Sequence, residues 1–189
     1  MTTADVVVLL FAGRRMPCPL RGLTTVNIDD ITAFRRVIVV GSDADLASVL
    51  TRLLRADRLD IEVGHAPSWR RARQARTAVA RRVPLIRDET GTVIVGAAEW
   101  IGSPLQGEAV VDDTVLFDGD VAGVRIEPIP TMPGLRAAVT GRGRRRWVAG
   151  RAAQLGTPDA TVVRDGVAAP RPVRRSTFYR HTEGWLQVR

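Results

Sequence analysis

The sequence predicts a two-part chain, with an α/β N-terminal half that has a mostly parallel sheet and a β-rich, sandwich-like C-terminal half. In the first half, continuous apolar runs alternate with segments of helical spacing, which is typical of parallel strands joined by helices. From Val83 onward, short β-rich runs are separated by Gly and Pro, which is typical of a sandwich or a strongly bent sheet. The 189 residues, 45% of them hydrophobic, suffice for two small cores, so we expect domains at 1–82 and 83–189.

The elements of the first half are expected in the order strand, strand, strand, helix, strand, helix. Apolar runs predict strands at 6–11, 24–28, 36–40 and 59–63, and helical spacing predicts helices at 43–55 and 68–82. The first helix has an acidic start and an arginine-rich end, as the helix dipole favours. Its apolar positions are Leu46, Val49, Leu50, Leu53 and Leu54. The second helix is strongly basic, and Ser68 is placed to cap it.

The second half is expected to be built from strands. Residues 89–92 predict a hairpin turn ahead of the β-rich run at 93–101. Further strands are expected at 108–112, 114–117, 121–127, 135–140, 146–149 and 160–164, with two more between 173 and 188. Because an unpaired strand edge favours pairing with another chain, a homodimer is one expectation.

Composition narrows the classes of function. No run of eighteen apolar residues predicts a membrane-spanning helix, and the apolar run at 6–11 has no basic segment ahead of it, so we interpret it as a core strand. The single cysteine, Cys18, cannot form an internal disulfide, which favours a reducing, cytoplasmic location. His65 and His181 lie in no zinc-binding pattern, so no metal site is predicted, and the nucleophile elbow of serine hydrolases is missing.

The basic residues carry more information. All 28 are arginines, and the net charge is +8. The lack of lysine excludes the phosphate-loop lysine, the Schiff-base lysine and the lysine general base. A GC-rich coding bias explains the preference for arginine, but the charge still favours phosphate ligands, nucleic acid or an acidic membrane surface.

The densest basic run predicts an anion-binding surface, made of Arg142, Arg144, Arg145, Arg146 and Trp147. Arginine forks bind phosphates bidentately, and a tryptophan can lie among lipid headgroups or stack on a base. A solvated hairpin tip is the simplest interpretation. Peripheral attachment to an acidic membrane is the second, and nucleic acid is the least favoured because no known nucleic-acid-binding motif is present.

The stretch VIVVGSDADL, residues 37–46, predicts a strand that turns directly into a helix N-terminus. Phosphate binds at such turns because the first N–H groups of a helix have no partner within it. Glycines let the phosphate approach the backbone, but only Gly41 is present, Ala44 narrows the approach, and Asp45 adds a negative charge unless Mg²⁺ lies between. The alternative is an ordinary turn in which Ser42 or Asp43 caps the helix.

This turn resembles that of the diacylglycerol-kinase-like and NAD-kinase-like superfamily. Its members carry a strand that ends in Gly-Gly-Asp-Gly-Thr before an amphipathic helix. Gly41 and Asp43 match this motif, whereas Ser42, Ala44 and Asp45 replace Gly, Gly and Thr.

Two further motifs of that family are partly matched. The resemblance spans most of the chain, which is considerably shorter than the members of the family. Asp165 and Gly166 match the start of an Asp-Gly-Glu motif, with Val167 in place of Glu. The family's Gly-Thr-Gly-Asn-Asp element is matched only at Gly64, and the closing run at 184–188 resembles the final strand. As plain structure, Asp165-Gly166 would be a hairpin turn, and residues 64–67 a strand-to-helix loop.

The resemblance implies a site in a cleft between the two halves, with ATP and Mg²⁺ as cofactors. Asp165 would be the general base for the acceptor hydroxyl. The implied nucleotide contacts are Gly41, Ser42, Asp43, Ala44, Asp45, Gly64, His65 and Ser68. Because all three motifs are altered, we expect a binding or scaffolding protein without kinase activity. The alternatives are an active ATP-dependent lipid kinase of the diacylglycerol type and an arginine-driven binder of anionic surfaces.

Overall fold

The computed structural model describes residues 5–11, 13–141 and 143–189, and the chain divides into two compact units. Unit 1 comprises Met1–Val83 and Glu183–Arg189, and unit 2 comprises Pro84–Thr182. The expected boundary after residue 82 lies one residue from the structural one. The last residues differ from expectation, because the sequence placed them in the C-terminal half and they belong to unit 1.

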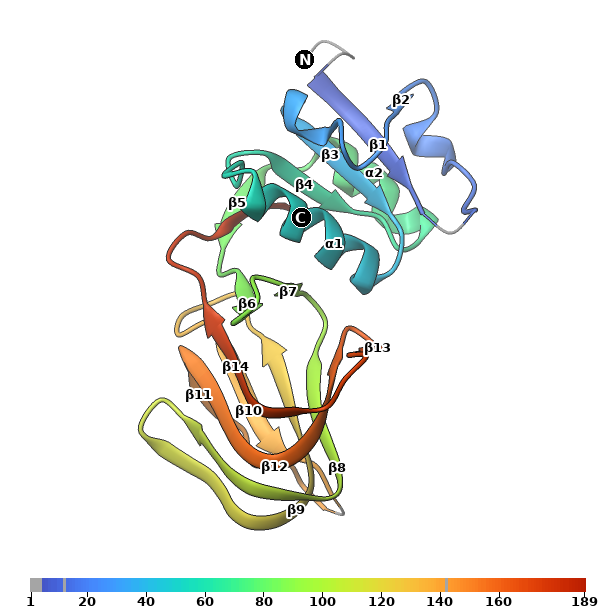
Figure 1. The fold of residues 1–189 in the computed structure, drawn as a ribbon. Coiled ribbons are helices and arrows are strands. Elements are labelled where there is room, and N and C mark those ends of the chain that lie inside the picture. The colour runs from blue at the N-terminus through green and yellow to red at the C-terminus, as the bar shows by residue number, and fades with distance from the viewer. Residues whose placement is uncertain (1–4, 12, 142) are drawn as a thin grey trace. The chain divides into compact units, whose positions relative to one another are not determined.

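Unit 1 is built on a mixed sheet with the strand order β2-β1-β3-β4-β15-β5 (Figure 1). Its strands pair in parallel, except that β5 runs antiparallel to β15. This confirms the mostly parallel sheet predicted for the first half, although three of the four predicted strands are shorter or shifted. The bounds are β1 (Val6–Leu10), β2 (Thr24–Thr25), β3 (Arg36–Val40), β4 (Glu62–His65), β5 (Ala80–Val83) and β15 (Trp185–Val188).

Helices α1 (Asp43–Arg55) and α2 (Trp69–Thr77) lie on opposite sides of this sheet (Figure 1). Because side chains alternate along a strand, Val6 and Val8 face the cluster that contains Ala72 and Ala75 of α2. The intervening Val7 is equally buried and faces the other side. Alternation thus explains why β1, covered on both faces, is apolar at every position. Two short 3-10 helices, Cys18–Leu20 and Ile31–Ala33, complete the unit.

The second helix is shorter than its sequence predicts. It ends at Thr77, where the prediction extended it to residue 82, and Ala78 already has an extended backbone. Residues Ala80–Val83 instead form β5 at the edge of the sheet, paired with β15. Strand pairing prevails here because α2 has only a narrow apolar face, with Ala72 and Ala75 as its buried residues.

Unit 2 is a curled antiparallel sheet, for which the sequence predicted many short strands; in the described chain it has nine strands. Three are long and take the place of several predicted short ones, and register shifts at Ile101/Leu105 and Gly156/Thr161 interrupt their pairing. The strongly bent sheet that the turn-rich pattern predicted describes this unit. The strands are β6 (Ile86–Asp88), β7 (Val93–Ile94), β8 (Ala98–Val111), β9 (Thr114–Pro128), β10 (Leu135–Val139), β11 (Val148–Gly150), β12 (Ala152–Arg164), β13 (Val167–Ala168) and β14 (Val173–Arg180).

The core of unit 2 is centred on Trp100 and Phe178, both fully buried, with ring centroids 6.0 Å apart. The indole N–H of Trp100 donates to the Ser176 hydroxyl at 3.0 Å, so this polar pair is satisfied inside the core. The chain enters and leaves the unit at neighbouring points, since the His181 N–H donates to the Leu85 carbonyl at 2.8 Å.

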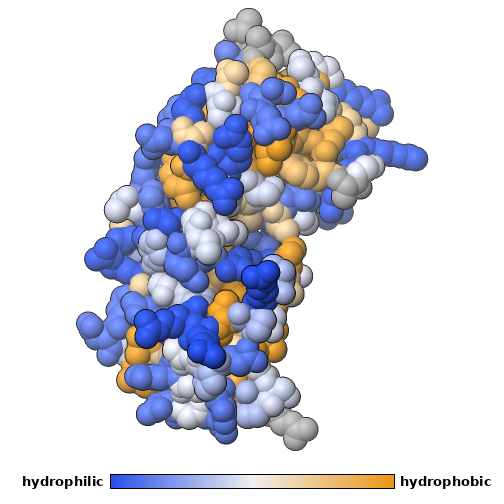
Figure 2. Space-filling view, viewed as in Figure 1, coloured by the Kyte–Doolittle hydropathy of each residue, from blue (hydrophilic) through white to orange (hydrophobic). Residues whose placement is uncertain are grey.

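On the visible face of each unit, hydrophilic side chains predominate, with hydrophobic surface between them (Figure 2). The large apolar side chains that remain exposed come from separate elements; they are Trp69, Val79, Ile101, Val115, Met132 and Val167. Within the residues that the structure describes, no helix has the length and apolar character needed to cross a membrane.

Candidate functional site

The turn between β3 and α1 is closed by a capping box. Ser42 is the N-cap, and its hydroxyl accepts the Asp45 N–H at 3.2 Å. In return, the Asp45 carboxylate accepts the Ser42 N–H at 2.7 Å and the Ser42 hydroxyl at 2.8 Å. The interpretation of this stretch as a turn capped by Ser42 is therefore confirmed, with Asp45 as its reciprocal partner.

The capping box uses the groups that would hold a phosphate. A helix N-terminus offers four N–H groups without intrahelical partners. Here Ser42 N–H bonds to the Asp45 carboxylate and Asp45 N–H to the Ser42 hydroxyl, which leaves those of Asp43 and Ala44. The carboxylates of Asp43 and Asp45 stabilise α1 through its dipole, and the same negative charges oppose a bound phosphate.

Gly41 leaves room for the Asp45 side chain of this capping box. A Cβ at Gly41 would lie 2.6 Å from Oδ2 and 2.7 Å from Cβ of Asp45, closer than real Cβ contacts. The one glycine retained in the turn therefore makes room for a side chain of the chain itself. In a phosphate-binding turn, the glycine would leave that space to the ligand.

His65, at the end of β4, reaches the same turn. Its Nε2 lies 3.2 Å from the Gly41 carbonyl oxygen, which can only accept, so Nε2 carries the proton. Its Nδ1 lies 3.8 Å from Asp43 Oδ1, a contact that becomes an ion pair when the ring is protonated. The structure thus brings His65 together with Gly41, Ser42, Asp43 and Asp45 at the carboxyl ends of two neighbouring parallel strands.

The remaining candidates of unit 1 are Gly64, within β4, and Ser68, at the start of α2. A Cβ at Gly64 would lie 2.9 Å from both the Cβ and the carbonyl oxygen of Ala75, so Gly64 allows α2 to pack closely on the sheet. Ser68 is the N-cap of α2, but its side chain makes no capping hydrogen bond. Arg14, from the loop after β1, donates to the Pro67 carbonyl at 3.2 Å.

Asp165 belongs to unit 2, where it lies in the β12–β13 hairpin turn with φ of 48° and is followed by Gly166 with φ of 83°. The hairpin interpretation of this dipeptide is confirmed. The Asp165 carboxylate accepts backbone N–H groups from Gly96 at 2.7 Å, from Ala97 at 3.0 Å and from Val95 at 3.1 Å. These bonds tie the hairpin to the β7–β8 connection.

The predicted anion-binding surface lies partly within the described residues. Arg142 lies outside the described residues, while Arg144, Arg145 and Arg146 are exposed in the loop that precedes β11. Trp147 is half-buried, and the Arg136 guanidinium stacks on its ring at 4.3 Å. Trp147 is therefore part of the structure of unit 2 and is not a free aromatic side chain.

Arg136 also belongs to an ion-pair network. Its guanidinium bonds to Glu127 at 2.6 Å, and Arg125 bridges Glu127 and Glu99 at 2.8 and 2.7 Å. Burial raises the pKa of Glu127, but the hydrogen bonds from Arg125 and Arg136 outweigh it, so the net pKa lies below the ordinary value. The bonds to Glu127 and Glu99 raise the pKa of Arg125.

Two features of the site were not predicted from the sequence. The spacing of Ser42 and Asp45 fits the Ser-x-x-acid pattern of a capping box, which predicts the reciprocal bond. From the sequence alone, the Asp45 charge is interpreted only as an obstacle to a nucleotide. The contact of His65 with Gly41 left no local signal, because it depends on the pairing of β3 with β4. Among the described residues, no cluster of three or more His, Cys, Asp or Glu could hold a metal ion.

No protein-family model and no curated protein sequence matches the chain. Solved structures do match it. A diacylglycerol kinase from Bacillus anthracis aligns with a TM-score of 0.69 and 12% identity, over 98% of this chain and 96% of that chain. An NAD kinase from Archaeoglobus fulgidus, in complex with ATP, aligns with a TM-score of 0.66 and 13% identity, over 97% and 93%. Yeast NADH kinase, complexed with NADH, aligns with a TM-score of 0.56 and 11% identity, over 87% and 64%.

These likenesses establish the fold. The chain has the fold of the diacylglycerol-kinase-like and NAD-kinase-like proteins, as the half-matched motifs predicted. At 11–13% identity the agreement concerns backbone architecture, so the chemistry has to be argued from the residues of this chain.

Proposed function

We propose that this chain is a kinase-fold protein that does not transfer phosphoryl groups and acts as a binding or scaffolding protein. The observation that supports it is the capping box, in which the Asp45 carboxylate accepts the Ser42 N–H at 2.7 Å. An internal carboxylate thus occupies a donor that a phosphate-binding turn would offer to its ligand.

The residues of the turn do not fit ATP and Mg²⁺. A triphosphate would have to displace Asp45 from Ser42 and approach a backbone that carries the Ala44 methyl group. Displacing Asp45 also costs α1 its cap, which contributes about 1 kcal/mol to stability. The cost of breaking the hydrogen bonds between Ser42 and Asp45 would therefore weaken nucleotide binding.

The candidate general base is also engaged. The Asp165 carboxylate already accepts three backbone N–H groups, which hold it in place. A base has to lie within hydrogen-bond reach of the hydroxyl from which it abstracts a proton, whereas these bonds hold the Asp165 carboxylate against the β7–β8 connection. We therefore assign Asp165 to the structure of the hairpin.

Thermal unfolding with increasing ATP and Mg²⁺ tests the proposal. A ligand present at 100 times its dissociation constant stabilises a protein by about 2.7 kcal/mol, which is readily measured as a shift in melting temperature. We expect no saturable shift and no transfer of labelled phosphate to a diacylglycerol. Saturable stabilisation together with turnover would establish an active lipid kinase instead.

A variant with the family's residues makes this test sharper. In Ala44→Gly/Asp45→Thr, the turn loses the methyl group and the internal carboxylate. We expect the variant to gain an ATP-dependent shift that the parent lacks, whereas the matched change Ala56→Gly/Asp57→Thr after the helix should gain none. Equal responses of all three proteins would contradict the role given to Asp45.

An arginine-driven binder is the second candidate, and a specific observation favours it. Arg144, Arg145 and Arg146 are exposed, and none forms an ion pair with another described residue. Acidic vesicles, with their negative surface potential, would attract such a cluster. Sedimentation with acidic vesicles should weaken as salt increases, and binding that ignores salt would contradict an arginine-driven contact.

A further inference from the structure

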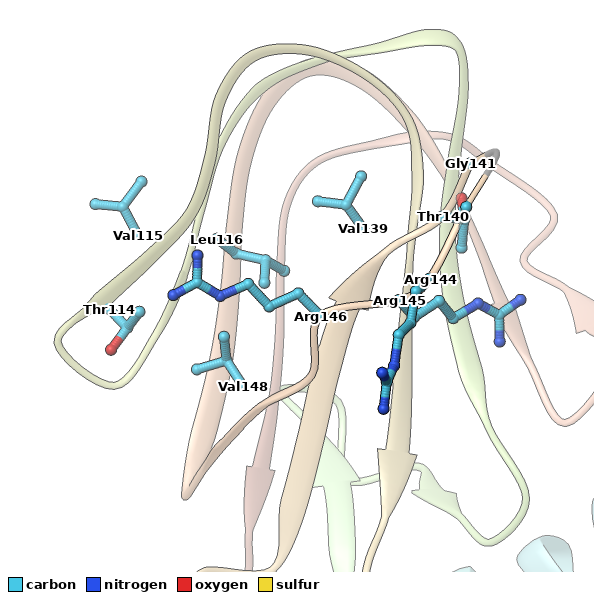
Figure 3. A pocket seen from close by; sticks show the side chains of 11 residues that line it. Thr114, Val115, Leu116, Val139, Thr140, Gly141, Arg144, Arg145, Arg146 and Val148 are labelled. Carbon is cyan, nitrogen blue, oxygen red and sulfur yellow. The ribbon is translucent and has the colours of Figure 1, made fainter.

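Unit 2 contains a cavity of about 440 Å³ between the start of β9, the end of β10 and the loop before β11 (Figure 3). Its volume falls within the range of sites that hold small molecules. The described lining residues are Thr114, Val115, Leu116, Val139, Thr140, Gly141, Gly143, Arg144, Arg145, Arg146 and Val148. The cavity lies within one unit and shares no residue with the β3–α1 turn.

One part of the lining is apolar. Leu116, Val139 and Val148 pack against the core of unit 2 with one side, and their other side faces the cavity. Val115 adds a methyl-bearing side chain that is 57% exposed. These side chains come from three different strands and offer one contiguous apolar wall for a hydrocarbon chain.

The other part of the lining is cationic. Figure 3 shows the Arg146 side chain extending toward Leu116 and the strand that carries Thr114, while Arg144 and Arg145 extend from another part of the loop. Arginines elsewhere in unit 2, such as Arg125 and Arg164, bond to carboxylates. The three arginines of the cavity form no such pair in the described chain, and no described lining residue is acidic. The charge of the cavity is therefore uncompensated.

We propose that this cavity binds a single-chain anionic amphiphile, taken up as a free molecule, with its hydrocarbon chain along the valines and its acidic head on Arg146. An apolar ligand alone would leave the arginines unused, and inorganic phosphate alone would leave the apolar wall exposed to water. The combination of wall and charge matches a ligand with both parts. This gives a ligand class to the binding protein proposed above, at a site that does not depend on the phosphate turn.

Calorimetric titration of the full chain with decyl phosphate, kept below its critical micelle concentration, tests the proposal. Decyl maltoside has the same chain without the charge, and inorganic phosphate has the charge without the chain. We expect saturable binding of decyl phosphate that is about tenfold tighter than that of either control. Equal binding of a control, or no binding of decyl phosphate, would overturn the proposal.

Substitutions locate the site. We expect Arg146→Gln to weaken decyl phosphate binding about tenfold and Arg146→Lys to restore part of it. Val115→Ser should weaken it about threefold through the lost apolar contact. Arg71→Gln, on the exposed face of α2 in unit 1, removes the same charge and should change nothing.

Two results distinguish binding in this cavity from binding to a bilayer surface and from nucleotide binding at the β3–α1 turn. If Arg146→Gln abolishes sedimentation with acidic vesicles but leaves decyl phosphate binding unchanged, the arginines serve a bilayer surface, and the proposed cavity ligand is refuted. If ATP binds at the β3–α1 turn while decyl phosphate still binds here, the function proposed above fails and this inference stands.

Discussion

The capping box of α1 allows a quantitative test of the central structural claim. The variants are Ser42→Ala, Asp45→Ala and the double substitution, which together form a double-mutant cycle. Asp43→Ala is the matched control, because it removes a charge from the same helical turn without touching a bond of the capping box.

The three hydrogen bonds set the expected magnitudes. Ser42→Ala removes the acceptor of the Asp45 N–H and should cost about 1 kcal/mol. Asp45→Ala removes the acceptor of two bonds from Ser42 and should cost about 1 to 1.5 kcal/mol. Asp43→Ala should cost only about 0.3–1 kcal/mol, through the helix dipole. Because the hydroxyl–carboxylate bond is lost in both single variants, the double variant should cost about 0.5 kcal/mol less than the sum.

Urea unfolding followed by far-ultraviolet circular dichroism is a suitable assay, since both α-helices of the described chain lie in unit 1. With a slope of about 1 kcal/mol per molar urea, each single variant should lower the midpoint by about 1 M. Costs that simply add would show that Ser42 and Asp45 are not coupled. An Asp45→Ala cost no larger than that of Asp43→Ala would refute the reciprocal cap.

Three further predictions concern packing, pH and the hairpin. Gly64→Ala should destabilise unit 1 by about 1–3 kcal/mol through overpacking against α2, whereas Gly156→Ala, with open space around it, should cost less than about 1 kcal/mol in urea unfolding. Because the pKa of Glu127 is lowered from 4.5 on folding, its stabilisation is present above that pH and is lost as the pH falls through the folded value; Glu127→Gln should reduce the acid sensitivity of melting. Asp165→Asn should cost about 1–3 kcal/mol because it disturbs three backbone bonds, whereas the exposed Asp118→Asn should be neutral in the same melts. Equal effects within either matched pair would refute the corresponding role, as would an unchanged acid profile for Glu127→Gln.

Local patterns in the sequence predicted the elements whose signals lie entirely within their own residues. The bounds of β3 and α1 match the expected 36–40 and 43–55, because a buried β-branched run and a capped amphipathic stripe are complete signals in themselves. The long strands of unit 2 were harder to predict from the sequence. Glycine and proline within β8, at Gly102, Pro104 and Gly107, indicated separate short strands. The structure accommodates Gly102 and Pro104 where the pairing with β9 shifts register, and all three where the pairing with β12 shifts.

Non-local pairing explains the other differences. Residues Ala80–Val83 carry a basic pattern compatible with the end of a helix, and only the arrival of Trp185–Val188 makes them an edge strand. In the site, the interpretation of the β3–α1 turn as a helix cap was confirmed. The contact of His65 with Gly41 required knowledge of the sheet order.

The return of β15 to unit 1 has a consequence for how the chain is made. β15 lies between β4 and β5 in the sheet, yet it is synthesised after the whole of unit 2. On the ribosome, unit 2 can fold once Thr182 has emerged, while the sheet of unit 1 waits for its penultimate strand in spatial order. The N-terminal unit thus completes its folding last, and a nascent chain stalled before Trp185 would expose two unpaired strand edges to its neighbours.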